Sequence, residues 1–489
     1  MKLSEIAQVM GVVRPPTEAE VTSLAYDPSK VVSGSLFFCI KGHKRDGHEF
    51  AQRAESLGAV GLVCESAVDV RIPVLSVANS RMALNAISSP FFGNPSTSLR
   101  IFGVTGTNGK TTTSFMMDSI FRASGDLSGL IGTIETRVGD DVMPGTFAGL
   151  GTPESCDLQM LLSRMRDAGV ASVTLEATSI GLDQGRIDGT LFDAVAFTNL
   201  TRDHIEDYHH SFEAYYQAKR KLFEKSRARA AAINIDDDWG RRLMHECELD
   251  VIGFAVDRKA DVNAIDVRLG SDGSSFTAVG PGFEVPVEIA MPGPFNVSNA
   301  LCAISASHLM SIDVEAVAQG LKDLPGVPGR FESIRCGQEF AVIVDYAHTP
   351  DSLGGVLRAA RHMTKGSLLV VFGCGGDRDQ SKRALMGEAA AKTADVVFAT
   401  SDNPRSEDPV AILKQVESGI LASAPPGGYS VIVDRTEAIT KALGQATEGD
   451  VVVIAGKGHE TGQEFASHTV EFDDRLVAAR VLKEMGYDS

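Results

Sequence analysis

The segment GVTGTNGKTTT, residues 103–113, places glycines, a lysine and threonines in the order that a phosphate-binding loop requires. An apolar run precedes it and a helix-favouring segment follows it, so we expect the loop to join a strand to a helix. Backbone N–H groups from Gly106 to Lys110 would then cradle phosphates, and the hydroxyl of Thr111 would hold Mg²⁺. Val104 occupies the first glycine position of the generic GxxxxGK[ST] pattern. The segment still predicts an ATP and Mg²⁺ site; the alternative is a glycine-rich turn that binds no nucleotide.

Two further polar residues stand where apolar runs end. Glu176 ends ASVTLE, and His204 follows DAVAFTNL. If these runs are adjacent strands of a parallel sheet, both side chains lie at the same edge, above the phosphate loop. Taken alone, Glu176 is equally an ordinary strand-end acid. His204 is equally a solvated loop histidine, since Mg²⁺ prefers oxygen ligands.

The elements that would position these residues alternate along the chain. Apolar runs separated by helical stretches are typical of parallel sheets with crossover helices, so the expected fold class is α/β. A chain of 489 residues is too long for one core. We expect three domains, at residues 1–97, 98–331 and 332–489. The second would have a central P-loop ATPase-type parallel sheet with a small antiparallel insert at 261–290, and the third would be Rossmann-like.

Polar turns follow most strands of the predicted third domain. Four of its five apolar runs continue directly into turns that contain glycine, proline or histidine, in the segments VDYAH, GCGG, SDNPR and GKGHE. Because ligands of open α/β sheets bind beyond the carboxyl ends of strands, these turns should line one cleft. In SDNPR, Pro404 restricts the backbone and so directs Arg405. The alternative for Arg405 is a helix-start arginine paired with Glu407 or Asp408.

Charge and cysteine content exclude several classes of partner. The net charge is −18, with 64 acidic and 46 basic residues, so the overall field repels nucleic acid and anionic lipid. Seven cysteines without a CxxC pair argue against a disulfide framework and a structural zinc site, and favour a reducing cytoplasm. The charged first ten residues and the lack of a long uncharged apolar window predict neither a signal peptide nor a membrane span. We expect a cytoplasmic monomer that acts on small molecules.

The loop variant TGTNGKT resembles that of the Mur ligases and their folylpolyglutamate synthase relatives. Nine further segments occur in the order typical of the family, namely LEATSIGLDQGRIDG, FTNLTRDHIEDYH, AKRKLFE, GPFNVSNAL, PGRFE, VDYAHTPDSL, GCGGDRD, DNPR and GKGHE. The resemblance covers nearly the whole chain and is to the members that add meso-diaminopimelate to UDP-N-acetylmuramoyl-L-alanyl-D-glutamate. It implies an ATP-dependent amide ligase of peptidoglycan precursor synthesis, with an acyl-phosphate intermediate.

The resemblance also implies roles at the ATP end of the site. The catalytic residues would be Lys110, Glu176, His204 and Lys219. The metal ligands would be Thr111, Glu176, His204 and Lys219 as a carbamate. ATP would contact Gly106, Thr107, Asn108, Gly109, Lys110, Thr111, Thr112, Asn296, Asn299, Arg330 and Asp345. Arg330 would reach the phosphates only when the domains close. The asparagines are equally helix caps, and Lys219 is equally a solvated helix lysine.

Both substrates have implied contacts as well. The UDP-sugar substrate would contact His43, Lys44, Arg45, Thr152, Thr178, Gln184 and Arg186. Diaminopimelate would contact Arg378, Asp402, Asn403, Pro404, Arg405, Gly456 and Glu460. The sequence departs from the family at three places, with Pro28 followed by Ser29, with Gly151 before Thr152, and with Ile180 after Ser179. Ser29 would supply the hydroxyl that the Pro28 position lacks.

Physically, diaminopimelate is lysine with a second amino-acid head, so its distal end carries a carboxylate and an ammonium. An arginine fork suits the carboxylate and a glutamate suits the ammonium. Three other functions are possible. They are a lysine-adding muramyl ligase, a folylpolyglutamate synthase-like ligase, and a regulatory ATP-binding module without catalysis.

Overall fold

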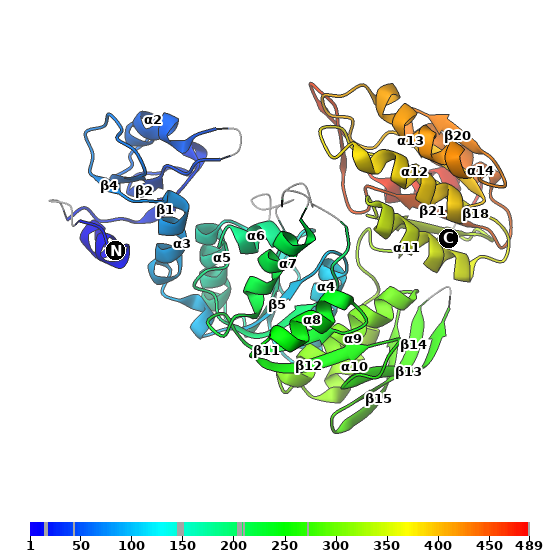
Figure 1. The fold of residues 1–489 in the computed structure, drawn as a ribbon, viewed down its shortest axis with the longest axis horizontal. Coiled ribbons are helices and arrows are strands. Elements are labelled where there is room, and N and C mark those ends of the chain that lie inside the picture. The colour runs from blue at the N-terminus through cyan, green and yellow to red at the C-terminus, as the bar shows by residue number, and fades with distance from the viewer. Residues whose placement is uncertain are drawn as a thin grey trace.

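The computed structural model describes residues 1–487 except 14–17, 43–44, 144–150, 203–207, 209–210 and 271–272. The described chain contains three main β-sheets, which lie in three lobes (Figure 1). The cyan-to-green lobe lies between the blue N-terminal lobe and the yellow-to-red C-terminal lobe. The predicted α/β class is confirmed, while the exact domain limits stay a prediction.

The first sheet is parallel and has four strands in sequence order. They are β1 (Ser23–Ala25), β2 (Ser35–Phe38), β3 (Gly61–Cys64) and β4 (Val74–Ser76). The helices of this lobe are α1 (Leu3–Val9), α2 (Ala51–Ser56) and α3 (Ser80–Phe91). Every residue of β2 and β3 is buried, as expected for central strands covered on both faces.

The second sheet has eleven strands in the order β15-β14-β13-β12-β11-β10-β5-β9-β6-β7-β8. The strands are β5 (Arg100–Thr105), β6 (Ser128–Ile131), β7 (Thr136–Val138), β8 (Asp141–Val142), β9 (Ser172–Glu176), β10 (Phe192–Phe197), β11 (Ala228–Asn234), β12 (Asp250–Ala255), β13 (Val262–Leu269), β14 (Ser274–Gly280) and β15 (Phe283–Ile289). The helices are α4 (Lys110–Ala123), α5 (Ser155–Asp167), α6 (Ser179–Asp183), α7 (Phe212–Arg220), α8 (Asp238–Glu246), α9 (Pro294–Leu309) and α10 (Val314–Asp323). Strands β13 to β15 pair antiparallel, which confirms the predicted insert.

The strand order corrects one prediction. Strands β9 and β10 are not neighbours, because β5 lies between them and pairs in parallel with both. Alternating apolar runs do not reveal this order, since each crossover can return to either side of the first strand. The carboxyl end of β5 therefore has Glu176 on one side and the loop after β10 on the other.

The third sheet has the order β16-β17-β21-β18-β19-β20, with only β16 antiparallel among its described strands. Its strands are β16 (Glu332–Ser333), β17 (Ala341–Asp345), β18 (Leu368–Phe372), β19 (Val396–Thr400), β20 (Tyr429–Ile432) and β21 (Val451–Ala455), and a separate hairpin contains β22 (Gly462–Glu464) and β23 (Thr469–Glu471). Its helices are α11 (Pro350–Met363), α12 (Ser381–Thr393), α13 (Pro409–Ser423), α14 (Arg435–Gln445) and α15 (Asp474–Glu484). Helices α11 to α13 contribute to one apolar core and α14 and α15 to another, so both faces of the sheet are covered.

Acidic residues at the start of α5 join the first two lobes. Asp157 accepts hydrogen bonds from the Tyr26 hydroxyl at 2.6 Å and from the Lys30 ammonium at 2.7 Å. Glu154 pairs with Arg81 of α3 at 2.6 Å and with Arg186 at 3.1 Å. All four basic or hydroxyl donors therefore converge on two carboxylates at this junction.

The linker to the third lobe is held by backbone contacts. Asp345 at the end of β17 accepts hydrogen bonds from the backbone N–H groups of Phe331 and Ala347, both at 2.7 Å. Burial raises the pKa of Asp345 above its ordinary value. A Cβ atom at Gly329 would lie 2.1 Å from the backbone nitrogen of His459, so only glycine fits there. The linker is thus packed directly on the segment GKGHE.

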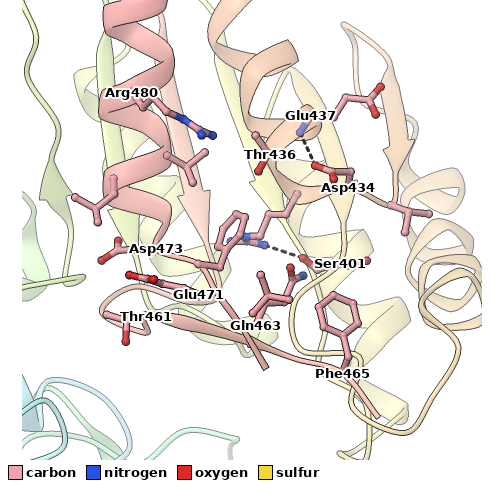
Figure 2. A pocket seen from close by; sticks show the side chains of 16 residues that line it. Ser401, Asp434, Thr436, Glu437, Thr461, Gln463, Phe465, Glu471, Asp473 and Arg480 are labelled. Atoms are coloured by element: carbon pink, nitrogen blue, oxygen red, sulfur yellow. Dashed lines mark hydrogen bonds between the residues drawn. The ribbon is translucent and has the colours of Figure 1, made fainter. Parts of the chain in front are cut away.

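A cavity of about 870 Å³ lies in the third lobe between β22–β23, α14 and α15 (Figure 2). Among its described lining residues, Ser401 alone belongs to SDNPR, so the cavity lies behind that segment. The fully buried ion pair of Arg435 and Asp474 stands beside it, and Arg435 donates to the backbone oxygen of Ser401. This pair supports the segment from the rear.

None of the described helices has the length and apolar character needed to cross a bilayer. All seven cysteines are free thiols in the structure.

Candidate active site

The phosphate loop lies between β5 and α4, as predicted. Gly106 and Gly109 have φ values of +155° and +86°, which favour glycine. A Cβ atom at Gly106 would lie 1.9 Å from the Thr198 hydroxyl, and one at Gly109 would lie 2.3 Å from Oδ1 of Asn299. The loop needs glycine at both positions for steric as well as conformational reasons.

Two lysine ammonium groups contact this loop. Lys110 Nζ donates to the backbone oxygens of Gly106 at 2.9 Å and Thr107 at 2.8 Å. Lys219, on α7, donates to the same oxygen of Gly106 at 2.8 Å. Lys219 is only 1% exposed, so the alternative of a solvated helix lysine is wrong. The fold brings both predicted lysines to one point of the phosphate loop.

Glu176 is fully buried at the end of β9 and organises this edge of the sheet. Its Oε2 accepts hydrogen bonds from the hydroxyls of Thr111 at 3.1 Å and Thr133 at 2.9 Å. Its Oε1 accepts from the backbone nitrogen of Thr133 at 2.9 Å. A Cβ atom at Gly132 would lie 2.6 Å from Oε1, so the turn before Thr133 must approach closely. No sequence motif marked Thr133, which stands outside the recognised segments.

Arg330 reaches the phosphate loop in this structure. Its Nη2 lies 3.4 Å from the Thr111 hydroxyl, and its guanidinium stacks 4.4 Å from the centre of the Tyr346 ring. The expectation that Arg330 reaches the ATP phosphates only when the domains close stays a prediction, and in this structure Arg330 contacts the loop that would hold them. Nε of Arg330 is buried and has no hydrogen-bond partner within the described residues.

The two predicted asparagines lie at the start of α9 but do not cap it. Gly293 is the N-cap, and no side chain supplies the cap hydrogen bond. Asn296 donates to the backbone oxygen of Pro292 at 2.9 Å, and Asn299 donates to Oδ1 of Asn296 at 3.2 Å. Asn299 also lies against Gly109, so the pair borders the phosphate loop.

The residues predicted to contact the sugar substrate lie beside Glu176. Thr152 donates to the backbone oxygen of Glu176 at 2.8 Å and lies 3.0 Å from the Thr178 hydroxyl. Arg186 donates to Oε1 of Gln184 through two nitrogens and to the backbone oxygen of Thr152. Burial lowers the pKa of Arg186 from its ordinary value, against the opposing effect of Glu154. Arg186 therefore already has protein partners and supports Thr152.

Among the other predicted residues of this group, Arg45 is part of the described structure. Arg45 is exposed. The hydrogen bond from the Ser29 hydroxyl lowers the pKa of Asp27 most, and the charge of Arg45 adds to this lowering. The Ser29 hydroxyl donates to Asp27 at 2.6 Å, so it acts here as a local turn contact. His43, Lys44 and His204 lie outside the described residues.

In the third lobe, the predicted turns meet at one sheet edge. Asn403 donates through Nδ2 to Oε2 of Glu460 at 2.9 Å, and its Oδ1 accepts from Lys457 at 2.9 Å. Lys457 also pairs with Oε2 of Glu460 at 3.0 Å and is fully buried. These contacts bring SDNPR and GKGHE together at the sheet edge, while the prediction that all four strand-end turns line one cleft stays a prediction. Lys457 is a residue of this region that the sequence reasoning missed.

Arg405 pairs with a residue that is distant in the sequence, not with Glu407 or Asp408. Its Nε pairs with Glu464 at 2.7 Å and its Nη1 donates to the backbone oxygen of Gly376 at 2.9 Å. Glu407 instead pairs with the buried Arg383, so the helix-start pairing of Arg405 is wrong. Arg405 also has a left-handed φ of +50°, held by its N–H bond to the Glu464 backbone oxygen. Glu464 is on β22, and no sequence pattern marked it.

Arg378, Asp402 and Gly456 complete this region. Arg378 is exposed and makes no hydrogen bond or ion pair with the described residues, so it is available to a ligand. Asp402 accepts from the Asn403 backbone nitrogen at 2.6 Å, and a Cβ atom at Gly456 would lie 2.6 Å from its other oxygen. Gly456, with φ +119°, thus lets Asp402 approach the loop.

The residues present fit a nucleotide phosphate and a hard cation. Oxygen atoms of Thr111 and Glu176 lie 3.1 Å apart at the loop, and such oxygen donors are what Mg²⁺ prefers. The described residues contain no preformed group of three or more His, Cys, Asp or Glu side chains for a metal. The remaining ligands of a Mg²⁺ ion would have to come from a phosphate oxygen and from Lys219 as a carbamate.

Comparison with known proteins decides the family. Three Mur ligase descriptions match the chain, namely the family's catalytic domain at residues 20–89, the middle domain at 104–307 and the glutamate ligase domain at 329–458. A Geobacillus kaustophilus relative named UDP-N-acetylmuramoyl-L-alanyl-D-glutamate--2,6-diaminopimelate ligase is 45% identical over 474 residues, which is 96% of each chain. The chain belongs to the Mur ligase family. The resemblance predicted from the sequence is therefore confirmed.

Other Mur ligases support the same assignment. A Streptomyces avermitilis relative of the same name is 40% identical and covers 99% of this chain and 96% of its own. A solved structure with that name is 31% identical, with a TM-score of 0.70 and 99% coverage of both chains. A Mycobacterium tuberculosis folylpolyglutamate synthase complexed with ADP and AMPPCP shares the fold alone, at 16% identity, TM-score 0.63 and coverage of 84% of this chain and 95% of its own.

The close contact at Gly109 gives a test of the phosphate loop. Gly109→Ala should reduce ATP affinity about tenfold or more, because the methyl group collides with Asn299 in addition to straining the backbone. Gly125→Ala is a matched control, since Gly125 has φ +90° but nothing within 4 Å of an added Cβ. Titration calorimetry with a non-hydrolysable ATP analogue measures both variants. Equal affinities in the two variants would contradict the role of this contact.

Proposed function

We propose that this chain is an ATP-dependent ligase that joins meso-diaminopimelate to UDP-N-acetylmuramoyl-L-alanyl-D-glutamate in peptidoglycan precursor synthesis. One observation carries the proposal. A phosphate loop with a buried glutamate lies on one sheet, Arg330 of the linker contacts both this loop and Tyr346 of the third lobe, and paired charges stand at the edge of the third sheet. Relatives of that name match the chain over nearly its whole length, which supports the same substrates. A cytoplasmic location is supported by the seven free cysteines.

The phosphate-loop residues would activate the carboxylate of the dipeptide. That carboxylate attacks the γ-phosphorus of ATP, ADP leaves, and an acyl phosphate forms. Lys110 and Arg330 both contact the loop and would neutralise the phosphates, so that two anions can approach each other. Mg²⁺ held by Thr111 and Glu176 would supply further charge screening when bound.

The third lobe would select the amine that completes the reaction. The amine nitrogen attacks the acyl carbon, phosphate leaves, and the nitrogen loses a proton as the amide forms. Arg405 and Arg378 would bind the distal carboxylate, and the second oxygen of Glu460 would accept from the distal ammonium. Lysine would leave the arginines unpaired. A site that is built to bond a polar group can discriminate against an analogue without that group by a factor of about 10⁴ in kcat/KM.

Lys219 is proposed to act as a carbamate. In the described structure its ammonium and that of Lys110 share the Gly106 oxygen. Reaction of the Lys219 amine with CO₂ releases one proton and forms a carbamate anion. Like-charge repulsion between the two lysines would thereby become attraction, and a new oxygen ligand for Mg²⁺ would form.

The reaction itself can be tested directly on the full chain. Phosphate release should require ATP, Mg²⁺, the UDP-sugar dipeptide and diaminopimelate together, with the amide product identified by mass spectrometry. Phosphate release with lysine in place of diaminopimelate would favour the lysine-adding alternative. Release with a pterin substrate would favour a folylpolyglutamate synthase-like ligase. ATP binding without phosphate release under any of these conditions would favour a regulatory module.

Arg405 gives a test of amine selection. Arg405→Ala should lower kcat/KM for diaminopimelate about 100-fold, because the distal carboxylate loses its charged hydrogen bonds. Turnover with lysine should change far less. Arg480→Ala is a control on the same lobe, since Arg480 is mostly exposed and only weakly paired with Glu484. Unchanged diaminopimelate turnover in Arg405→Ala would remove this assignment.

Lys219 gives a test of the carbamate. Lys219→Ala should lose activity, and acetate or formate should partly restore it by placing a carboxylate at the same point. Lys225→Ala is the control, because Lys225 is exposed and pairs with Glu248. Steady-state phosphate release with and without the added acid measures the effect. Full activity of Lys219→Ala in the absence of acid would show that no carbamate is needed.

A further inference from the structure

Lys457 has an environment that its place in GKGHE does not predict. Its side chain is fully buried, yet it carries an ammonium group that needs compensation in the interior. Within the described chain, its only ion-pair partner is Glu460, at 3.0 Å, and its other hydrogen bond is to Oδ1 of Asn403 at 2.9 Å. Both partners are residues that would contact the amine substrate.

These contacts fix the amide of Asn403. Its Oδ1 accepts from the Lys457 ammonium and from the backbone nitrogen of Glu464 at 3.0 Å. Neither group can accept a hydrogen bond, so the amide oxygen must face them and Nδ2 must face Glu460. Nδ2 and Lys457 both use Oε2 of Glu460, and Oε1 accepts no hydrogen bond within the described residues. One oxygen of Glu460 is therefore held ready for a ligand.

The charges around this point also balance. Lys457 offsets Glu460, and Glu464 offsets Arg405. Arg378 and Asp402 are the remaining charged residues of the proposed amine site, and both act electrostatically on nearby Tyr346, as Glu460 does. These six residues, counted without Arg330 of the neighbouring phosphate loop, comprise three basic and three acidic groups. A site without net charge suits a ligand head that carries one carboxylate and one ammonium.

We infer that Lys457 is a specificity-determining positioning residue, which balances Glu460 and fixes Asn403 so that the site accepts a zwitterionic distal head and rejects a cationic one. This inference rests on the proposed function. Without Lys457, the charge of Glu460 is uncompensated, and the site becomes more attractive to the ammonium of lysine and less attractive to a distal carboxylate. The selectivity would then come from a lysine that does not itself touch the amine.

The first experiment compares Lys457→Met with the unaltered enzyme, using diaminopimelate and lysine as amines. The ratio of their kcat/KM values should fall about tenfold or more, mainly through a higher KM for diaminopimelate, while the KM for ATP stays the same. A merely structural role would lower both amines equally, and an unchanged ratio would overturn the inference. Lys392→Met is the control, since Lys392 is 63% exposed and pairs with Glu388 on the same helix.

A second variant covers the case in which Lys457→Met does not fold. Lys457→Met combined with Glu460→Gln removes both charges and leaves no uncompensated group, so it should fold. In this double variant the ratio of kcat/KM for diaminopimelate to that for lysine should also be low. Asn403 is no longer fixed, and the distal ammonium has lost its carboxylate partner. A ratio equal to that of the unaltered enzyme would overturn the inference.

A third measurement uses the unaltered chain. Lysine has a cationic distal end, and 2-aminopimelate has an anionic one. A balanced site should bind both more weakly than diaminopimelate, and within about tenfold of each other by calorimetry. Binding of lysine more than tenfold tighter than 2-aminopimelate would show that Glu460 is not offset. If the unaltered enzyme does not turn over diaminopimelate at all, the proposed function fails instead, which separates the two failures.

Discussion

The buried carboxylate of Glu176 is the interaction on which the central lobe depends. A carboxylate without solvent must have its lone pairs filled by donors, and the donors here come from α4 through Thr111 and from the turn after β6 through Thr133. The backbone oxygen of the same residue accepts from Thr152. One residue therefore connects the phosphate loop to the proposed sugar contacts. Its position follows from the parallel sheet, because β9 pairs with β5 and both end at the same edge.

In the third lobe, charged side chains are compensated by ion pairs instead of by hydrogen bonds from hydroxyl groups. Arg405 with Glu464, and Lys457 with Glu460, place charged groups where a ligand would arrive. Arg383 with Glu407, and Arg435 with Asp474, fix the backbone of the same turns from behind. Buried pairs of this kind add little net stability but hold geometry, because leaving one partner alone costs several kcal/mol.

Much of this arrangement could be predicted from sequence, and the rest depends on long-range packing. The ends of the strands could be predicted because each apolar run stops at a polar turn. The proximity of Asn403 and Glu460 was therefore expected. The positions of β9 and β10 in the sheet could not be predicted, because a crossover connection has the same local sequence pattern whether it returns to one side of β5 or to the other. Glu464 lies 59 residues after Arg405, and a single glutamate on an exposed hairpin has no distinguishing pattern. The burial of Lys457 depends on the fold around it.

The backbone contact between Gly329 and the segment GKGHE has a mechanical consequence. Because Gly329 lies against His459 without any intervening side chain, and Phe331 donates to Asp345, the linker cannot rotate independently of the third lobe. Arg330 must then travel as part of that rigid body. Any swing of the third lobe would change the distance from Arg330 to Thr111 directly, so the pivot of such a swing has to precede Gly329 in the chain.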